Sequence, residues 1–272
     1  MGTESRNPRS FGLDRMSAEQ IVRLMNEEDL SVNRALQAAE IPIARAAERV
    51  AQAFAAGGRI VYVGAGTSGR VATMDAAEMP PTFGIDSDRF VSVIAGGNAA
   101  GVNAVEDAED SVGTGIEALN HLHLTSQDVV IGIAASGTTP FVVSAVEHAG
   151  RIGCWTCGIA NNRGTPLLDV VSHPMLLDTG PEVLTGSTRL KAGTSQKMVL
   201  NRISTIAMVL SGKVIENLMV DVKANNTKLK DRCVRILREL APVTHDEALE
   251  LLEQNSWNVR RALEAVGMAG RK

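Results

Sequence analysis

The chain has 272 residues, of which 44% are hydrophobic but only 3% aromatic, and its formal net charge at pH 7 is −4. This length suffices for one large domain or a main domain with a small appendage, with a core built mainly from aliphatic side chains. Nucleic acid is excluded as a main partner, because phosphate-backbone binding needs concentrated lysine and arginine and no basic cluster stands out.

The sequence indicates neither a targeting segment nor a membrane span. Residues 1–16 form a polar stretch with no apolar run behind it, unlike a secretory signal. No apolar run approaches the roughly 20 residues that a membrane helix needs. We therefore expect a soluble cytoplasmic protein whose first residues form an extended arm.

Helices are expected between this arm and the first strand. Ser17 opens a helix, and Gln20 completes a capping-box pattern with it. A further helical stretch is expected over 31–56, where Pro42 should divide or kink it. The glycine pair 57–58 should end it.

The central part of the chain alternates between apolar runs and helical patterns, which is typical of an α/β fold. The expected strands are 59–63, 90–94, 129–134, 153–159 and 174–177, and the expected helices are 68–78, 98–107, 111–121, 139–151 and 164–170. Two of these strands, 59–63 and 129–134, are almost continuously apolar, as in a parallel sheet covered by helices on both faces. We expect a doubly wound, mainly parallel five-stranded sheet that binds its ligand at the carboxyl ends of the strands.

The C-terminal part has a helical pattern. A long helix is expected over 190–219 and another over 223–240. Pro242 then separates a tail, 243–267, with two short amphipathic helices, which resembles a small ubiquitin-associated-like module. Packing of this tail against the main domain is the preferred interpretation.

Cys154 and Cys157 form a C-x-x-C pattern inside the apolar run 152–159. A redox pair normally lies at a helix N-terminus, where the thiolate is stabilised, and not inside a strand. The chain has three cysteines, an odd number, which also argues against a disulfide framework. Core packing explains these cysteines better than redox chemistry or metal binding.

Two turns rich in serine and threonine, residues 64–70 and 135–140, each follow an apolar strand. A strand that turns through small residues into a helix directs several backbone N–H groups and the helix dipole at one point. Ser and Thr hydroxyls add further donors there. We expect the two turns to form one pocket for a phosphorylated small molecule, the plainer alternative being that they are only tight connections.

The first turn also fits the dinucleotide fingerprint G-x-G-x-x-G through Gly64, Gly66 and Gly69. That fingerprint needs an acidic residue at the end of the next strand to hold the ribose hydroxyls. The next strand, 90–94, ends instead in the Ala-Gly-Gly of 95–97. A nicotinamide site is therefore disfavoured, and a phosphomonoester suits the hydroxyls better.

Several motifs along the chain resemble those of the N-acetylmuramic acid 6-phosphate etherases, which belong to the sugar-isomerase (SIS) domain superfamily. The matching stretches are 3–8, 63–70, 75–84, 94–98, 104–110, 134–140 and 185–194. The most specific is Glu-x-Pro-Pro-Thr-Phe-Gly at 78–84, and Met79 is a small departure where many relatives are expected to have Cys. The resemblance covers nearly the whole chain.

The resemblance implies hydrolytic removal of D-lactate from N-acetylmuramic acid 6-phosphate, which yields N-acetylglucosamine 6-phosphate in the recycling of cell-wall sugars. It implies a flavodoxin-like SIS fold, a homodimer, and neither a metal nor an organic cofactor. The expected parts are an N-terminal arm with helices packing on the core (1–56), an SIS phosphosugar-binding domain (57–220) and C-terminal helices with the small module (221–272).

Cleaving such an ether is easiest by elimination. In the open-chain sugar, a base removes the proton at C2, an acid protonates the departing oxygen at C3, and water then adds back at C3. Glu78 and Glu109 match the family's two catalytic glutamates, with Glu109 assigned as the base and Glu78 as the acid. The proline pair 80–81 should place Glu78 at a helix end. Crowding by Glu106 and its neighbours should raise the pKa of Glu109. The composition alone favours a solvated acidic helix face at this position, and only the match to the family reverses that preference.

The resemblance and the two turns together define the expected substrate-binding residues. They are Gly66, Thr67, Ser68, Gly69, Arg70, Ser136, Gly137, Thr138, Thr139, Ser187 and Lys191. Two other functions remain open on the same fold: a non-catalytic sugar-phosphate sensor, and a sugar-phosphate isomerase that removes the C2 proton without breaking an ether.

Overall fold

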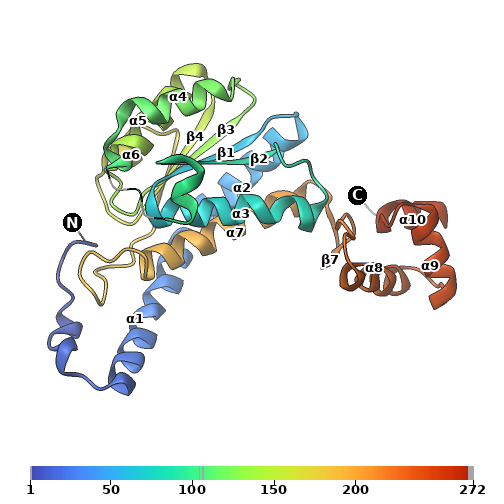
Figure 1. The fold of residues 1–272 in the computed structure, drawn as a ribbon, viewed down its shortest axis with the longest axis horizontal. Helices are drawn as coiled ribbons and strands as arrows, with labels where there is room; N and C mark the ends of the chain where they lie inside the picture. Colours follow the sequence, from blue (N-terminus) through green and yellow to red (C-terminus); the bar gives the residue numbers. More distant parts are fainter. Residues whose placement is uncertain (1, 104, 106, 269–272) are drawn as a thin grey trace.

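The computed structural model describes residues 2–103, 105 and 107–268, and its centre is a five-stranded parallel sheet (Figure 1). The strands are β1 (Ile60–Gly64), β2 (Phe90–Ile94), β3 (Val129–Ile133), β4 (Trp155–Ala160) and β5 (His173–Leu176). They lie in the order β2-β1-β3-β4-β5, and every neighbouring pair is parallel. The expected strands and the doubly wound fold are confirmed.

Helices cover both faces of the sheet, because alternate side chains of a strand point to opposite sides. On β1, Ile60 and Tyr62 join one apolar cluster, whereas Val61 and Val63 join the other. The first cluster is completed by α1 (Ala18–Ala38), α2 (Glu40–Ala55), α3 (Gly66–Phe83) and α7 (Lys191–Leu210). The second is completed by α4 (Val112–His121), α5 (Pro140–Ile152) and α6 (Pro166–Asp169), which lie above the sheet in Figure 1.

The N-terminal helices divide at a different place from the one expected. The capping box of Ser17 and Gln20 is present, but α1 runs without interruption to Ala38, and the break falls at Ala39. Pro42 lies in the first turn of α2, where its missing N–H leaves no helical hydrogen bond unmade. The predicted division of this stretch is therefore confirmed, but it falls at Ala39, just before Pro42, and not at the proline itself.

Two expected helices were also wrong in extent. Among the described residues of 98–107 there is only a 3₁₀ helix, Gly97–Gly101, next to Gly96, which has a φ of 82°. The helix expected over 190–219 ends at Leu210, because Gly212 adopts a left-handed φ of 72°. A hairpin of β6 (Val214–Ile215) and β7 (Leu218–Met219) follows.

The end of α3 departs from the expectation for Glu78. The helix continues through Pro80 and Pro81 to Phe83, and the following residue, Gly84, ends it with a left-handed φ of 65°. Both prolines lack the backbone donor of an interior helical residue, but the burial of Met79 and Phe83 in the core offsets that loss. Glu78 thus lies on the exposed side of a helix interior, and the predicted helix end at this position was wrong.

The C-terminal residues build an apolar core of their own. The helices α8 (Thr227–Leu240), α9 (His245–Gln254) and α10 (Val259–Ala265) pack together with the β6–β7 hairpin. The two short tail helices are confirmed, and Figure 1 shows this module beside the main body, beyond the end of α3. The module is tied to the main body by Lys223, whose ammonium donates a hydrogen bond of 3.1 Å to the Ile85 carbonyl and whose backbone N–H donates one of 3.2 Å to the Pro81 carbonyl.

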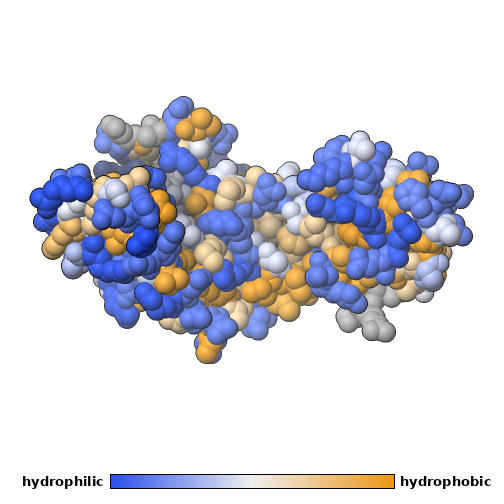
Figure 2. All heavy atoms as spheres, turned by 90° about the horizontal axis from the view of Figure 1, so that it is seen from below, coloured by the Kyte–Doolittle hydropathy of each residue, from blue (hydrophilic) through white to orange (hydrophobic). Residues whose placement is uncertain are grey.

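The layer of helices below the sheet leaves apolar side chains uncovered. Met74 on α3 is 46% exposed, and Val209 and Leu210 at the end of α7 are 46% and 57% exposed. Figure 2, which views the molecule from below, shows hydrophobic surface on this side between the main body and the C-terminal module.

Candidate active site

The two serine- and threonine-rich turns lie side by side at one edge of the sheet. Strands β1 and β3 are parallel neighbours, with Gly64 opposite Ile133 at their carboxyl ends. Strand β2 lies on the other side of β1, so the strand order switches direction here. Ligands bind at such switch points in open α/β sheets.

A cavity of about 390 Å³, the turn pocket, opens between the two turns. Its lining residues are Glu4, Ala65, Gly66, Thr67, Ser68, Glu109, Asp110, Ile133, Ala134, Ala135, Ser136, Thr138, Thr139, Pro140 and Thr188. The structure thus brings together six of the expected binding residues, three from each turn. It also places the expected base, Glu109, on the wall of the same cavity.

Both helices that open at the turn pocket lack a side-chain cap. The N-cap residue of α3 is Ala65 and that of α5 is Thr139, and neither makes a capping hydrogen bond through its side chain. The first backbone N–H groups of a helix have no partner within it, and they lie at the positive end of the helix dipole. The two helix ends therefore favour an anion in this cavity.

The hydroxyls of the two turns do not all face the cavity with a free proton. Ser136 Oγ accepts a hydrogen bond of 3.2 Å from the Thr138 N–H, so its own proton is available to a ligand. Ser68 is buried and donates its proton to Gln196 Oε1 at 2.8 Å. The Ser68 hydroxyl proton is therefore not available to a ligand.

Two of the expected binding residues, Gly69 and Gly137, shape the turns and do not line the cavity. A Cβ at Gly69 would lie 2.5 Å from Ile94 Cγ1, so only glycine allows α3 to approach β2 this closely. Gly137 has a φ of 71°, and a Cβ there would lie 2.3 Å from Thr165 Oγ1. Both glycines are thus required by packing.

Glu109 lies between the turn pocket and a second cavity of about 230 Å³, the side pocket. Both cavities are lined by Ala65, Gly66 and Glu109, and the side pocket adds Arg70 and Asp107. Glu109 reaches this position from the 3₁₀ helix Ala108–Asp110, which precedes α4. Glu106, which the expected crowding of carboxylates included, lies outside the described residues.

Arg70 supplies a positive charge to the side pocket, where it is partly buried. Its Nη2 donates a hydrogen bond of 2.9 Å to the Asn103 carbonyl. Within 2–103, 105 and 107–268, we find no carboxylate in an ion pair with Arg70. The guanidinium therefore keeps donors available for an anionic ligand.

Glu78 does not line either cavity of its own chain. It lies 12 residues after Gly66 on α3, and a rise of about 1.5 Å per residue places it roughly 18 Å along the helix axis. Its side chain is exposed. One chain therefore brings only one of the two expected glutamates, Glu109, to the pocket.

Lys191 is buried away from the turn pocket, so its prediction as a phosphate ligand was wrong. Its ammonium lies 2.6 Å from Glu28 Oε2. Asn7 donates a further hydrogen bond of 2.8 Å to the same oxygen. Because a buried carboxylate requires a partner, the pair holds α1 against the start of α7. Ser187 does not line the turn pocket either, and Thr188 takes its place.

Replacing Lys191 by methionine should lower the free energy of unfolding by about 3 kcal/mol, because the variant removes the buried cation of Glu28 and leaves only the half-exposed Arg9 as its ionic partner. Chemical denaturation measures this difference. The matched control is Lys197→Met at an exposed position of the same helix, for which we expect a change within about 0.5 kcal/mol. A Lys191 variant that stays fully stable but loses phosphosugar affinity would return Lys191 to the binding site.

The effect of Lys191→Met should depend on pH. Burial raises the pKa of Glu28, but hydrogen bonds from Lys191 and Asn7 and the charge of Arg9 outweigh it, so the pKa is lowered from its ordinary 4.5. A carboxyl group of this kind stabilises the fold above its unfolded pKa, and the contribution is lost as the pH falls through the folded pKa. The stability difference between wild type and variant should therefore narrow below pH 4.5.

Two residues of the turn pocket, Glu4 and Thr188, were not expected from the sequence. Glu4 lies near the N-terminus, far along the chain from both turns, and no local spacing rule relates such positions. The only signal was its place in the motif at 3–8, which says nothing of where the arm packs. Thr188 lies directly after Ser187, so that prediction missed by one position.

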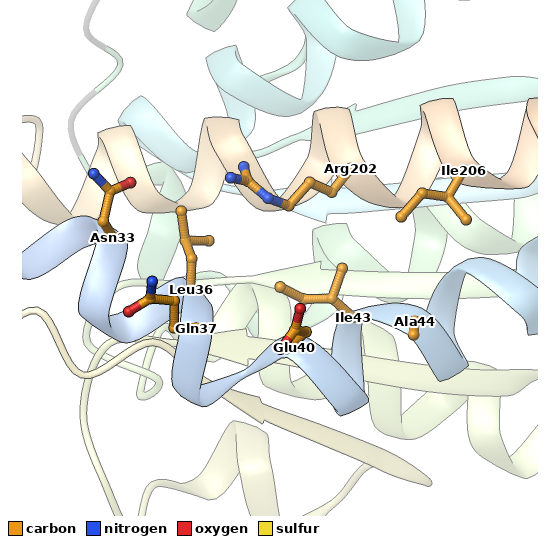
Figure 3. Close-up of a pocket in the computed structure, with 8 residues that line it drawn as sticks. All are labelled: Asn33, Leu36, Gln37, Glu40, Ile43, Ala44, Arg202 and Ile206. Atoms are coloured by element: carbon orange, nitrogen blue, oxygen red, sulfur yellow. The ribbon is translucent and has the colours of Figure 1, made fainter.

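A larger cavity, of about 550 Å³, lies elsewhere, between α1, α2 and α7 (Figure 3). Arg202 and Ile206 line it from α7, opposite Leu36 and Ile43. None of the expected site residues lines this cavity. Size alone therefore does not identify the active site, and the turn pocket remains the better candidate.

The two cysteines of the C-x-x-C pattern pack on opposite faces of the sheet, so they do not form a redox pair. Cys157 packs in the apolar cluster below the sheet, whereas Cys154 packs in the cluster above it. Burial raises the pKa of Cys154 to about 11, and burial also raises that of Cys157. The interpretation as core packing is confirmed. In the part of the chain that the structure describes, no three His, Cys, Asp or Glu residues form a group that could hold a metal ion.

A search of the helices within the described ranges finds none with the length and apolar character needed to cross a membrane.

Comparisons with known sequences give one family profile and close relatives. The profile of the glucokinase regulatory protein N-terminal SIS domain matches residues 42–149. An N-acetylmuramic acid 6-phosphate etherase of Staphylococcus aureus (strain bovine RF122 / ET3-1) is 46% identical over 268 residues, which are 98% of this chain and 89% of that protein. The etherase of Staphylococcus saprophyticus is also 46% identical, over 96% of this chain and 88% of its own length.

Solved structures share the fold at much lower identity. A protein of Escherichia coli CFT073, solved in complex with a ligand, has a TM-score of 0.52 at 17% identity, over 74% of this chain and 97% of that one. The phosphoheptose isomerase of Neisseria gonorrhoeae has a TM-score of 0.53 at 19% identity, over 69% and 97% of the two chains. At this identity the likeness establishes the SIS-type fold alone.

Proposed function

The chain belongs to the N-acetylmuramic acid 6-phosphate etherase family, and we propose that it cleaves the D-lactyl ether of that sugar phosphate with water. The products are N-acetylglucosamine 6-phosphate and D-lactate. The reaction serves the recycling of cell-wall amino sugars in the cytoplasm. It uses the side chains of the protein without a metal or an organic cofactor.

The observation that carries this proposal is the turn pocket, where two uncapped helix ends and several hydroxyls adjoin a carboxylate. The substrate phosphate binds the N-terminal ends of α3 and α5, with Ser136 and Thr138 as additional donors. In this pose the carbon chain of the sugar extends toward Glu109 on the wall of the pocket. A phosphate anchor and a proton-transfer group then lie within one cavity.

The reaction proceeds by elimination and addition in the open-chain sugar. Glu109 removes the C2 proton, which the neighbouring aldehyde acidifies, and the C2–H electron pair forms the C2–C3 double bond. The C3–O bond breaks, and Glu78 protonates the departing oxygen, so lactate leaves as the free hydroxy acid. Water then adds its hydroxyl at C3 and a proton returns to C2. Each positioned proton-transfer group contributes about 10²–10⁴-fold to the rate.

The lactyl carboxylate is the second anion of the substrate, and it binds Arg70 in the side pocket. The supporting observation is charge: among the described residues no cationic side chain lines the turn pocket, whereas the side pocket contains Arg70 beside the carboxylates of Asp107 and Glu109. Glu109 lies between the two cavities, next to where the bond to lactate would break.

Exchanging Arg70 for glutamine should raise KM for the lactyl substrate by about tenfold or more, because a charge-assisted contact to the carboxylate is lost. Affinity for N-acetylglucosamine 6-phosphate, which has no lactyl group, should stay unchanged. Steady-state kinetics and calorimetric titration measure the two quantities. If the variant bound the lactyl substrate and N-acetylglucosamine 6-phosphate equally more weakly, Arg70 would contact the phosphate instead.

Glu78 serves the pocket of a second copy in a homodimer. Its side chain is exposed and far from the pocket of its own chain. Met74, four residues earlier and therefore on the same face of α3, is 46% exposed. An exposed apolar side chain next to an exposed functional carboxylate supports a partner surface at this face.

The test is incubation of the purified protein with N-acetylmuramic acid 6-phosphate, followed by an assay for D-lactate. In ¹⁸O-water, the label should appear in the C3 hydroxyl of the amino sugar, because water adds to the unsaturated aldehyde. Label in lactate would mean displacement at the lactyl carbon and would overturn the elimination scheme. Binding without lactate release would favour a sensor, and ketose formation would favour an isomerase.

A further inference from the structure

One wall of the turn pocket comes from the N-terminal arm, and the proposed reaction gives it no role. Thr3 is fully buried, and its N–H donates a hydrogen bond of 3.0 Å to Asn162 Oδ1. Asn162 Nδ2 donates one of 2.8 Å back to Thr3 Oγ1. The arm is therefore docked through a reciprocal pair of hydrogen bonds.

This docking joins the arm directly to the second turn. Asn162 Nδ2 also donates to the Ala135 carbonyl at 3.0 Å, next to Ser136. On the other side, the Gly186 N–H donates to the Thr3 carbonyl at 3.3 Å. Further along, Asn7 is held by Glu28 at 2.8 Å. Glu4 thus lies between two fixed points of the arm, Thr3 and Asn7.

The Glu4 carboxylate lines the turn pocket together with Ser136, Thr138 and Thr188. Gly186, with a φ of 74°, leaves room for it, because a Cβ there would lie 3.0 Å from Glu4 Oε2. Over the described ranges, no donor forms a hydrogen bond or an ion pair with this carboxylate. A ligand in the pocket can therefore use all of its acceptor capacity.

We propose that Glu4 is a substrate-binding residue that accepts hydrogen bonds from the uncharged hydroxyl or amide N–H groups of the sugar. This inference rests on the proposed function. A carboxylate repels both the phosphate and the lactyl carboxylate, so it faces the part of the ligand between them. Hydrogen bonds from a hydroxyl to a carboxylate are charge-assisted and about twice as strong as neutral ones. The docked arm then determines which sugar the pocket accepts.

The experiment compares the affinities of Glu4→Ala and wild type for two probes, N-acetylglucosamine 6-phosphate and inorganic phosphate, by calorimetric titration. The variant should bind the sugar phosphate about tenfold to a hundredfold more weakly. Its affinity for inorganic phosphate should be unchanged or stronger, since a nearby negative charge is removed. Glu4→Gln should give a smaller loss, because the amide oxygen still accepts.

Two controls separate Glu4 from a general effect of the arm. Asp14→Asn changes another exposed carboxylate of the same arm, outside the turn pocket, and should leave both affinities unchanged. Thr3→Val removes a docking hydrogen bond of the arm. It should both weaken the binding of N-acetylglucosamine 6-phosphate and speed proteolysis of the arm. Glu4→Ala should leave that proteolysis rate unchanged.

Unchanged sugar-phosphate affinity in Glu4→Ala would overturn the inference, and so would an equal loss for inorganic phosphate. The outcome is distinct from that of the proposed function. If wild type releases no lactate, the etherase proposal fails, whereas the affinity measurements still decide whether Glu4 holds the sugar.

Discussion

Glu109→Gln should lower kcat for lactate release by about 10²–10⁴-fold while leaving the affinity for N-acetylglucosamine 6-phosphate nearly unchanged. The amide has the size of the carboxyl group but takes up no proton at neutral pH. The proposed phosphate contacts come from the two turns and do not involve Glu109, so binding should persist. Rapid-quench or coupled assays of D-lactate give kcat, and titration gives the affinity.

Whether Glu109 is the base can be tested separately from whether it is needed for lactate release. In deuterated water, a base at C2 exchanges the substrate's C2 hydrogen for deuterium, and Glu109→Gln should lose this exchange together with lactate release. Exchange that continues while lactate release stops would make Glu109 the acid. Glu117→Gln, an exposed carboxylate on the following helix, is the matched control and should retain both activities.

The local features of the site could be predicted because neighbouring residues determine them. An apolar run, a short turn and a helix start follow one another within residues 60–70, and their geometry depends little on the rest of the chain. The same is true of β3 and the turn before α5. Parallel pairing of β1 and β3 then brings the turns together. The meeting of the two turns at one cavity could therefore be predicted from the sequence.

The contacts that the sequence did not indicate are those between distant parts of the chain. Lys191 is separated from its partner Glu28 by 163 residues, and Thr3 from Asn162 by 159. No periodicity or motif spacing relates such positions. The sequence alone therefore does not show whether the Lys191 ammonium contacts a phosphate or pairs with a buried carboxylate. For the same reason the position of Glu4 in the turn pocket could not be predicted, because it depends on how the arm docks.

Local propensity was also overridden by packing in α3. Pro80 and Pro81 argued for a helix end near Glu78, yet Met79 and Phe83 on the buried side keep the helix intact. This matters for function, because the intact helix carries Glu78 outward and along the axis, away from the turn pocket of its own chain. The position of Glu78 is what makes a shared site the consistent interpretation of two catalytic glutamates.

Glu78→Gln should lower kcat by about 10²–10⁴-fold, as expected for a lost general acid. Binding of the sugar phosphate should remain, since the proposed phosphate contacts lie on another part of the chain. Because the side chain is exposed, the substitution should not disturb folding, and the thermal midpoint should match wild type. Full lactate release by this variant would remove Glu78 from the mechanism.

Mixing the two inactive variants decides whether one site uses both chains. If Glu109 of one chain works with Glu78 of the other, a heterodimer of Glu78→Gln and Glu109→Gln contains one site with both glutamates intact and one with neither. Random exchange makes about half of the dimers mixed, so about a quarter of wild-type activity should return. If each chain used its own two glutamates, every site in the mixture would lack one of them and activity would stay at the level of the separate variants. Because Glu78 lies outside the turn pocket of its own chain, we expect the first result.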